Sequence, residues 1–509
     1  MRGPHNIWRL IQTGATFERT GAMKVVLEAM NAPSGVRVAA RVLGWPFKWL
    51  GVRGDPSLPP VTRAIMALGP AYIKFGQILS TRPDVVGDEL ALQLRVLQDK
   101  LPPFSTEQAK RIIASELEMP LEAMFSEFSE PVAAASIAQV HRARLVGTGR
   151  EVAVKVLRPN IERAFRKDID AFYLIAWTIE TMAPSARRLR PREVIKHFEG
   201  IVMRELDLRI ESAAAGEFAA NTAKDEGFEV PAVEWFLSSR KVMTLGWANG
   251  AQMADIEAID AFGVDRRDLA SRVLQMFLRH ALRDGYFHAD MHQGNLKVAA
   301  NGNIIALDFG IMGRLDEYTR RVYAEILMGF IRKDYRRVAE VHFEAGYVSA
   351  DRDIDEFAQA LRSVGEPIFG MDANRISMAR LLSYLFDVTQ QFGMETRTEL
   401  ILLQRTMVVV EGVARSLDPT INIWSVSRPV VESYIKENIG PKAIIADLLR
   451  TARVLSRFGP RLPQLAEKIL LAQTNPVNEP PRWRKRDGLA WALVGGVIGA
   501  AIVIAFTGY

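Results

Sequence analysis

Cysteine is absent from this 509-residue chain, which excludes disulfide bridges, cysteine-ligated zinc or iron–sulfur sites, and thiol catalysis. The N-terminal sequence has no apolar run long enough for a signal peptide, and we find no internal repeat. With 49% hydrophobic and 24% charged residues, the composition is that of a globular protein, and the lack of cysteine fits a reducing compartment. Because single hydrophobic cores rarely exceed about 250–300 residues, we expect two to four structural units.

Acidic residues are scarce at both ends of the chain. Residues 1–54 contain eight Lys/Arg and two Asp/Glu, and residues 441–487 contain ten and four, whereas the whole chain carries a net charge of only +6. Basic ends predict contact with an anionic surface, either a nucleic acid or a membrane. The C-terminal sequence favours the membrane, so we predict no nucleic-acid partner.

A run of 18 residues without a charge, 489–506, follows a basic cluster at 482–486. At 1.5 Å per residue it would extend roughly 27 Å, enough to cross a hydrocarbon core as a helix. The basic cluster would stay on the cytoplasmic side. We therefore predict one C-terminal span in the cytoplasmic (inner) membrane, with the catalytic body on the cytoplasmic side. Gly495 and Gly499 form a GxxxG pair, a weak sign of a homodimer through this span.

Residues 35–52 mix Arg, Lys, Trp and Leu, which suits either an interfacial membrane segment or an amphipathic helix docked on the body. Helical periodicity is expected over 61–80, 161–183 and 192–220, and two short helices are expected over 105–128. Two strands joined by a Gly-Thr-Gly turn are expected within 136–159, and a loop, strand, turn, strand and loop are expected within 286–310.

Three motifs occur in the order that protein kinases use. Lys155 ends a VAVK strand, His288-Ala289-Asp290 is followed five residues later by Asn295, and Asp308-Phe309-Gly310 comes thirteen residues after that. Phosphoryl chemistry explains these residue types. Lys155 can hold the phosphates of ATP, Asn295 and Asp308 can hold Mg²⁺ through oxygen atoms, and Asp290 can orient or deprotonate the acceptor.

Lys155 also needs a carboxylate on a neighbouring helix, and the candidates are Glu199, or Glu205 with Asp207. The glycine-rich loop of protein kinases is missing. An alanine-rich segment stands in its place, made of Ala133, Ala134, Ala135, Ser136, Ile137, Ala138 and Gln139. Alanine disfavours the positive φ angles that glycine allows, so this loop should hold nucleotide differently. No A-P-E sequence follows Asp308, which argues against a peptide-docking segment.

Three other functions remain open at this point. His288, Asp290 and His292 alternate, as the ligands of a metal-dependent hydrolase would on a strand. A catalytically weak pseudokinase scaffold that binds nucleotide or lipid is the second alternative. A true protein or small-molecule kinase is the third.

Over roughly residues 60–345 the sequence resembles the UbiB/ADCK family of atypical protein-kinase-like proteins. The family's KxGQ motif matches Lys74-Phe75-Gly76-Gln77, and its ExD motif matches Glu205-Leu206-Asp207. The alanine-rich loop, catalytic loop and metal motif match the segments above. The resemblance implies regulatory roles for Lys74, Gly76, Gln77, Glu205 and Asp207. It also implies that the helical extension carries Lys74 and Gln77 across the active site and that the ExD carboxylates face this extension. By position it assigns Glu199 as the partner of Lys155. Thr244 and Gly246 lie in the matching hinge and are expected to contact adenine, although many family members carry an acidic residue where this chain has Gly246.

The resemblance also implies an α+β fold with two kinase-like lobes, an N-terminal helical extension and a mostly helical C-terminal lobe. We expect a basic N-terminal segment (1–59), the extension (60–130), the N-lobe (131–250) and the C-lobe (251–345), then a helical region (346–474), a linker (475–488) and the membrane helix (489–506). The implied activity is ATP hydrolysis with Mg²⁺ in ubiquinone biosynthesis. The implied partners are membrane lipids or polyprenylated quinone precursors and other enzymes of that pathway.

Overall fold

The computed structural model describes residues 5–29, 38, 45–80, 88–94, 103–182, 190–369, 388, 391–394 and 398–439. The chain divides into a compact unit ending at Lys436 and a second unit, Glu437–Tyr509, of which 437–439 are described. Within the described part of the chain, no helix is both long and apolar enough to span a bilayer. The predicted span and its linker, residues 475–506, lie outside that part.

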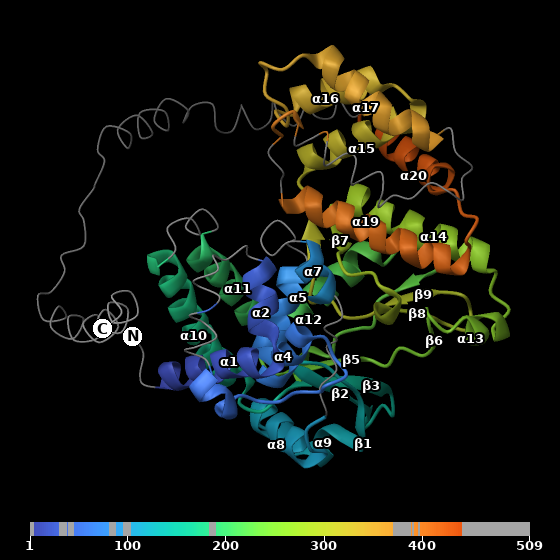
Figure 1. Ribbon diagram of the computed structural model, residues 1–509. Coiled ribbons are helices and arrows are strands. Elements are labelled where there is room, and N and C mark those ends of the chain that lie inside the picture. The colour runs from blue at the N-terminus through green and yellow to red at the C-terminus, as the bar shows by residue number, and fades with distance from the viewer. Residues whose placement is uncertain are drawn as a thin grey trace, which may run out of the picture. The chain divides into compact units, whose positions relative to one another are not determined.

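The N-terminal part of the first unit is helical (Figure 1). Its elements are α1 (His5–Thr20), α2 (Ala22–Ala29), η1 (Trp45–Leu50), α4 (Pro60–Leu68), α5 (Pro70–Ser80) and α7 (Asp88–Leu94). The stretch 61–80, expected to be helical, forms two helices. Gly69 adopts a φ of 106° and Pro70 begins α5, and a proline lacks the N–H that a continuous helix would need there.

An antiparallel sheet of order β1-β2-β3-β5 follows α8 (Thr106–Leu117) and α9 (Leu121–Met124). Its strands are β1 (Phe125–Ala134), β2 (Ala138–Leu145), β3 (Glu151–Leu157) and β5 (Val242–Gly246). The predicted hairpin with its Gly-Thr-Gly turn is confirmed as β2 and β3. The two short helices predicted within 105–128 are confirmed as α8 and α9, but the prediction is wrong at its end, because β1 already begins at Phe125.

The two faces of this sheet carry different side chains: one face is apolar, and the other carries Lys155. Val152, Val154 and Val156 of β3 are fully buried and pack with Ile113 of α8 in a separate apolar cluster. Because side chains alternate along a strand, Lys155 points to the opposite face. Residues directly across the ladder share a face, so the pairing register decides which neighbours lie beside Lys155.

Three helices connect β3 to the next strands: α10 (Ile161–Met182), α11 (Pro191–Glu205) and α12 (Leu208–Thr222). The prediction that 192–220 is helical is confirmed, but the stretch is divided between α11 and α12. The helix is interrupted at Leu206, and the Asp207 side chain caps α12 by accepting a hydrogen bond from the backbone N–H of Arg209. This break decides which acidic residue reaches Lys155.

The following part has two small sheets. One has the order β4-β9-β8-β6, and in the other β7 pairs with β10. The strands are β4 (Phe228–Glu229), β6 (Ala251–Gln252), β7 (Tyr286–His288), β8 (Leu296–Val298), β9 (Ile304–Ala306) and β10 (Met312–Arg314). Between them lie η3 (Trp235–Leu237), α13 (Ile256–Ala261), α14 (Arg266–Arg279), the π-helical turn η4 (His280–Asp284) and η5 (Gln293–Asn295).

Helices dominate the remaining described residues of this unit. They are α15 (Glu317–Arg332), α16 (Tyr335–Glu344), α17 (Ile354–Phe369), α19 (Thr398–Leu417) and α20 (Ile423–Asn438). Helix α19 packs along α14, as Figure 1 shows. One large apolar core includes residues of α4, α5, α12, α14 and α19, so these late helices share a core with the elements around Lys155.

Candidate active site

Lys155 is the centre of a cluster of charged groups. Its Nζ lies 2.7 and 2.9 Å from the two carboxylate oxygens of Glu211 and 3.7 Å from Oδ2 of Asp308. Burial alone would disfavour the ammonium, but Asp308 and Glu211 outweigh it and raise the pKa of Lys155. Lys155 in turn lowers the pKa of Asp308. A permanently charged lysine held by α12 is suited to bind phosphate groups.

The prediction that Glu199 pairs with Lys155 is wrong. Glu199 lies on α11, and its Oε2 accepts a hydrogen bond of 2.7 Å from the hydroxyl of Tyr173 on α10. The physical reason is the break at Leu206–Asp207, which makes the Lys155-binding helix a separate element that begins at Leu208.

Glu211 was missed, although the sequence contains a signal for it. Asp207 is a good N-cap residue, so a new helix was possible at Leu208. On that helix Leu208, Ala215 and Phe218 are buried at helical spacing. Glu211 falls on the same face, three residues after Leu208 and four before Ala215. An acid on a buried helix face needs a charged partner, and Lys155 supplies it.

The catalytic loop and the metal motif meet through the hairpin of β8 and β9. In this hairpin Leu296 pairs with Ala306, and the N–H of Leu307 donates to the carbonyl of Asn295 at 2.8 Å. Asn295 therefore lies beside the residue that precedes Asp308. The thirteen-residue spacing from Asn295 to Asp308 is the length of this hairpin, and the predicted strand–turn–strand context is confirmed.

Asp308 and Phe309 connect the metal motif to α12. Asp308 has a left-handed φ of 57°, unusual for a residue other than glycine, which turns the chain between the two side chains. Phe309 is buried, and its ring centroid lies 6.0 Å from that of Phe218. Since Phe218 comes seven residues, or two turns, after Glu211, one face of α12 contacts both Lys155 and Phe309.

His288 supports the backbone of the catalytic loop. Its Nε2 donates to the carbonyl of Leu307 at 2.9 Å, and its Nδ1 accepts from the N–H of Asp290 at 3.1 Å. Burial lowers the pKa of His288, so the ring is neutral at pH 7. Both ring nitrogens are thus used by the backbone, which contradicts the alternative of a His288–Asp290–His292 metal site. The Asp290 side chain itself is 38% exposed and can reach a substrate.

The alanine-rich loop is folded by Arg158. The guanidinium donates to the carbonyl of Ala135 at 2.9 and 3.2 Å, and the N–H of Arg158 donates to the carbonyl of Ile137 at 2.8 Å. No residue from 133 to 139, all of them described, has a positive φ, as expected for alanine in place of glycine. The loop is therefore shaped without the left-handed turns that glycine permits.

The prediction that Gln139 binds nucleotide is wrong. It lies opposite Val156, on the sheet face turned away from Lys155. Its amide exchanges hydrogen bonds with the backbone of Phe104 and contacts His141 Nε2 at 2.9 Å. Gln139 therefore fixes the segment before α8 onto the sheet. Because side chains alternate along a strand, the pairing register places Gln139 on the sheet face opposite Lys155.

The prediction that Thr244 contacts adenine is wrong for the same reason. It pairs with Val154, is fully buried, and donates its hydroxyl to the carbonyl of Leu237 at 2.7 Å. The residues of β5 on the Lys155 face are Met243 and Leu245. Gly246 ends the strand and has no side chain to direct, so its predicted adenine contact stays a prediction.

The KxGQ helix contacts the ExD motif. Lys74 of α5 lies with its Nζ 2.8 Å from Oε1 of Glu205, and both side chains are mostly buried. Both ExD carboxylates were expected to face the extension, but the Asp207 carboxylate accepts hydrogen bonds from the backbone N–H and the guanidinium of Arg209 instead. Gly76 is buried and Gln77 half-buried on the same helix, and their regulatory roles stay predictions.

Helix α19 supports the catalytic loop from more than 100 residues away in sequence. The buried hydroxyl of Thr406 lies 3.1 Å from the carbonyl of Ala289, the neighbour of Asp290, and 2.8 Å from that of Leu402. The Gln293 amide donates to the hydroxyl of Ser416 at 2.6 Å. The late helical region, to which the sequence assigned no role, thus braces the loop that carries Asp290.

The residues present fit a magnesium site. The Asn295 amide nitrogen donates to the carbonyl of Asp290 at 3.0 Å, which leaves the amide oxygen as the atom for a cation. Asp308 Oδ1 accepts from the N–H of Gly310 at 3.2 Å, and Oδ2 is near Lys155. A carboxylate and an amide oxygen are hard ligands of the kind Mg²⁺ prefers.

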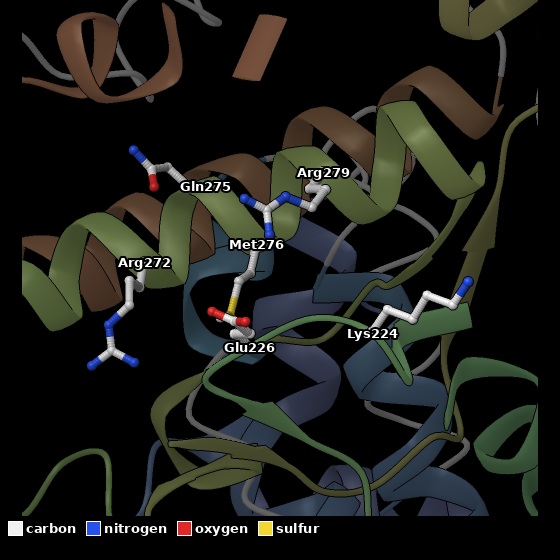
Figure 2. Close-up of a pocket in the computed structure, with 6 residues that line it drawn as sticks. All are labelled: Lys224, Glu226, Arg272, Gln275, Met276 and Arg279. Atoms are coloured by element: carbon white, nitrogen blue, oxygen red, sulfur yellow. The ribbon is translucent and has the colours of Figure 1, made fainter. Parts of the chain in front are cut away.

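Two other features of the described residues do not form the site. Asp225, His280 and Asp284 offer closely spaced ligand atoms, but the guanidinium of Arg283 binds both carboxylates and supplies the positive charge there. A hollow of about 390 Å³ lies beside α14 (Figure 2). The head groups of Lys224 and Arg272 point away from one another at its two ends, so they do not converge on a ligand.

Comparison with known proteins agrees with this geometry. Residues 96–342 match the ABC1 atypical kinase-like domain, and residues 361–422 match the UbiB helical domain. "Probable protein kinase UbiB" of Marinobacter nauticus is 39% identical over 413 residues, covering 80% of this chain and 75% of the relative. The protein of the same name from Xanthomonas campestris is 40% identical over 421 residues, covering 81% and 76%.

A solved structure is also similar. It is the complex of Rv3197 with erythromycin from Mycobacterium tuberculosis, with a TM-score of 0.51 and 26% identity, covering 70% of this chain and 90% of that one. The fold is thus kinase-like, mostly helical and with mixed sheets, as the sequence predicted. From the two domain matches and the extent of its likeness to the UbiB proteins, this chain belongs to the ABC1/UbiB family of atypical kinase-like proteins.

Proposed function

We propose that this protein is a membrane-anchored Mg²⁺-dependent ATPase that serves ubiquinone biosynthesis. The observation that carries the catalytic part is the cluster of Lys155, Glu211 and Asp308, with Asp290 and Asn295 on the adjoining loop. These groups have the charges and spacing that phosphoryl chemistry requires. The pathway assignment rests on family membership and on the resemblance of the motifs.

Each residue of the cluster has a defined role in this proposal. Lys155 binds the phosphates of ATP and is held in position by Glu211. Asp308 and Asn295 hold Mg²⁺, which neutralises charge on the phosphates when it is bound. Asp290 orients a water molecule and accepts its proton, as the bond between the γ-phosphorus and the oxygen of the leaving ADP breaks.

The position of the KxGQ helix supports ATP hydrolysis over protein phosphorylation as the proposed activity. Lys74 of α5 pairs with Glu205, the last residue of α11, and its positive charge also helps to lower the pKa of Asp308. Lys74 therefore lies near the metal motif, where a peptide acceptor would need access. The absence of an A-P-E sequence after Asp308 points the same way.

The membrane part of the proposal rests on the sequence of residues 482–506. The apolar stretch would anchor the chain, and the basic cluster before it would keep the kinase-like body on the cytoplasmic side of the inner membrane. From there the ATPase would help present polyprenylated phenol precursors, which reside in the bilayer, to other enzymes of the pathway.

The test is Mg²⁺-dependent ATP hydrolysis by the purified full chain, with and without anionic liposomes. Asp290→Asn is the control, because it keeps size and hydrogen bonding but cannot accept the proton. We expect turnover that rises with liposomes and is lost in the variant. Retained nucleotide binding without turnover would refute the ATPase and favour the pseudokinase scaffold, an alternative supported by the position of Lys74. Phosphate transfer to a protein would favour a true kinase.

A further inference from the structure

Exposed aromatic side chains lie on both α1 and η1, two elements that pack against each other. Trp49 is 73% exposed, Trp8 55% and Phe47 47%, although tryptophan and phenylalanine are usually buried. Basic and apolar residues accompany them. We call this set the α1–η1 face: Trp8, Phe47, Lys48, Trp49, Val52 and Arg53.

The fold holds these side chains outward. The Arg19 guanidinium donates to the carbonyls of Trp49 and Gly51 at 3.1 and 2.7 Å, and the N–H of Val52 donates to the hydroxyl of Thr16 at 3.0 Å. Gly51 approaches α1 so closely that a Cβ would lie 2.3 Å from the carbonyl oxygen of Ala15. The turn that presents Trp49 is therefore fixed to α1 at three points.

Helix α1 is itself anchored to the body. Arg9 donates to both carboxylate oxygens of Asp168 on α10 at 2.6 and 3.1 Å, and to the carbonyl of Leu68 at the end of α4. The hydroxyls of Thr13 and Tyr72 are 2.6 Å apart, which joins α1 to the KxGQ helix. The α1–η1 face therefore belongs to a part of the chain that is firmly attached to α4, α5 and α10.

We infer that the α1–η1 face binds the surface of an anionic lipid bilayer. Tryptophan and phenylalanine beside lysine and arginine are the residues that insert at the boundary between headgroups and acyl chains. Residues 1–54 carry eight basic and two acidic side chains, which complements anionic headgroups. A second copy of the chain would present the same positive charge, so self-association through this face is disfavoured.

This inference rests on the proposed membrane location but adds a second contact, separate from the proposed span. The structure describes residues 38 and 45–52 of the stretch 35–52: η1 packs against α1, and its aromatic side chains are still exposed. A body held at both its N-terminal face and its C-terminal anchor would keep one orientation toward the bilayer.

The absence of cysteine allows a direct test. Val52→Cys and Val146→Cys each introduce one thiol at an exposed valine, the first on the α1–η1 face and the second at the turn between β2 and β3. Each full-length variant is labelled with an environment-sensitive fluorophore. The labelled chains are reconstituted into vesicles of phosphatidylcholine alone or mixed with phosphatidylglycerol, with and without brominated acyl chains as quenchers.

We expect the label at position 52, but not at 146, to shift to the blue and to be quenched by brominated lipid when phosphatidylglycerol is present. Adding Lys48→Gln to Val52→Cys should lower the ratio of bilayer-bound to free label about fivefold, the effect of one basic residue near an anionic surface. An unquenched label at 52 would overturn the inference. So would a blue shift that depends on protein density and not on lipid, since that indicates a protein contact.

Flotation and ATP hydrolysis of the same samples separate this inference from the proposed function. A chain that floats with the vesicles while label 52 stays unquenched would refute the α1–η1 face alone. A quenched label in a chain without ATP hydrolysis would refute the ATPase and leave the face in place.

Discussion

Replacing Glu211 by glutamine tests the central correction that the structure makes to the sequence. The change removes one charge from a pair whose side chains are only 19% and 11% exposed. Removing one member of a buried ion pair costs about 3–5 kcal/mol, because the other charge is left without compensation. Lys155 keeps Asp308 at 3.7 Å, so we expect the lower end, about 3 kcal/mol.

The effect on activity should be larger than the effect of a surface change. Without Glu211, α12 no longer fixes the ammonium of Lys155, and a displacement of about 1 Å costs roughly 100-fold in rate. We therefore expect Glu211→Gln to lower kcat/KM for ATP hydrolysis by about that factor. Urea unfolding measures the stability, and steady-state hydrolysis with ATP titration measures the activity.

Glu199→Gln is the matched control. Glu199 accepts one hydrogen bond from Tyr173, and the carbonyl oxygen of glutamine can still accept it, so the change should cost less than about 1 kcal/mol. If Glu199→Gln loses activity while Glu211→Gln unfolds and hydrolyses ATP like the wild type, the assignment by sequence position is right. The Lys155–Glu211 pairing would then have no functional importance.

Three further predictions concern the metal motif, the α19 brace and a buried histidine. Asp308→Asn should abolish Mg²⁺-nucleotide binding in calorimetry, and wild-type binding would contradict its role as metal ligand. Thr406→Val removes a hydroxyl that contacts the catalytic loop, so kcat should fall about fivefold, equivalent to about 1 kcal/mol, with KM unchanged, whereas Thr406→Ser should restore it. Burial lowers the pKa of His342 to about 4, so the unfolded chain binds its proton first and stability should fall by up to about 3 kcal/mol between pH 6.5 and 4. His342→Phe should remove this part of the pH dependence in urea unfolding, and an unchanged pH profile would exclude His342 as its source.

The parts of the site that are local in sequence could be predicted. Lys155 stands on a strand with a recognisable pattern, and Asp290, Asn295 and Asp308 have spacings that one short loop and one hairpin account for. Motif spacing encodes geometry where few residues separate the partners. The pairing of Lys74 with the ExD motif followed only from resemblance to a family, because more than 100 residues intervene.

The errors share a physical origin. The pairing of Lys155 with Glu211 depends on where α11 ends and α12 begins, and the end of a helix is set by a cap that competes with continuation. The sheet face on which Gln139 and Thr244 lie depends on the pairing register, because a one-residue difference in register reverses the face of every side chain.

By itself, the sequence determined the kinase-like chemistry: which residues carry charge, in what order, and at what local spacing. It also determined what is missing, namely cysteine, a glycine-rich loop and an A-P-E segment. Only the tertiary structure decided which acid pairs with Lys155, which residues share the sheet face of Lys155, and that Thr406 of α19 contacts the catalytic loop. These last relations depend on how separate helices and strands pack, and packing couples residues that no sequence spacing connects.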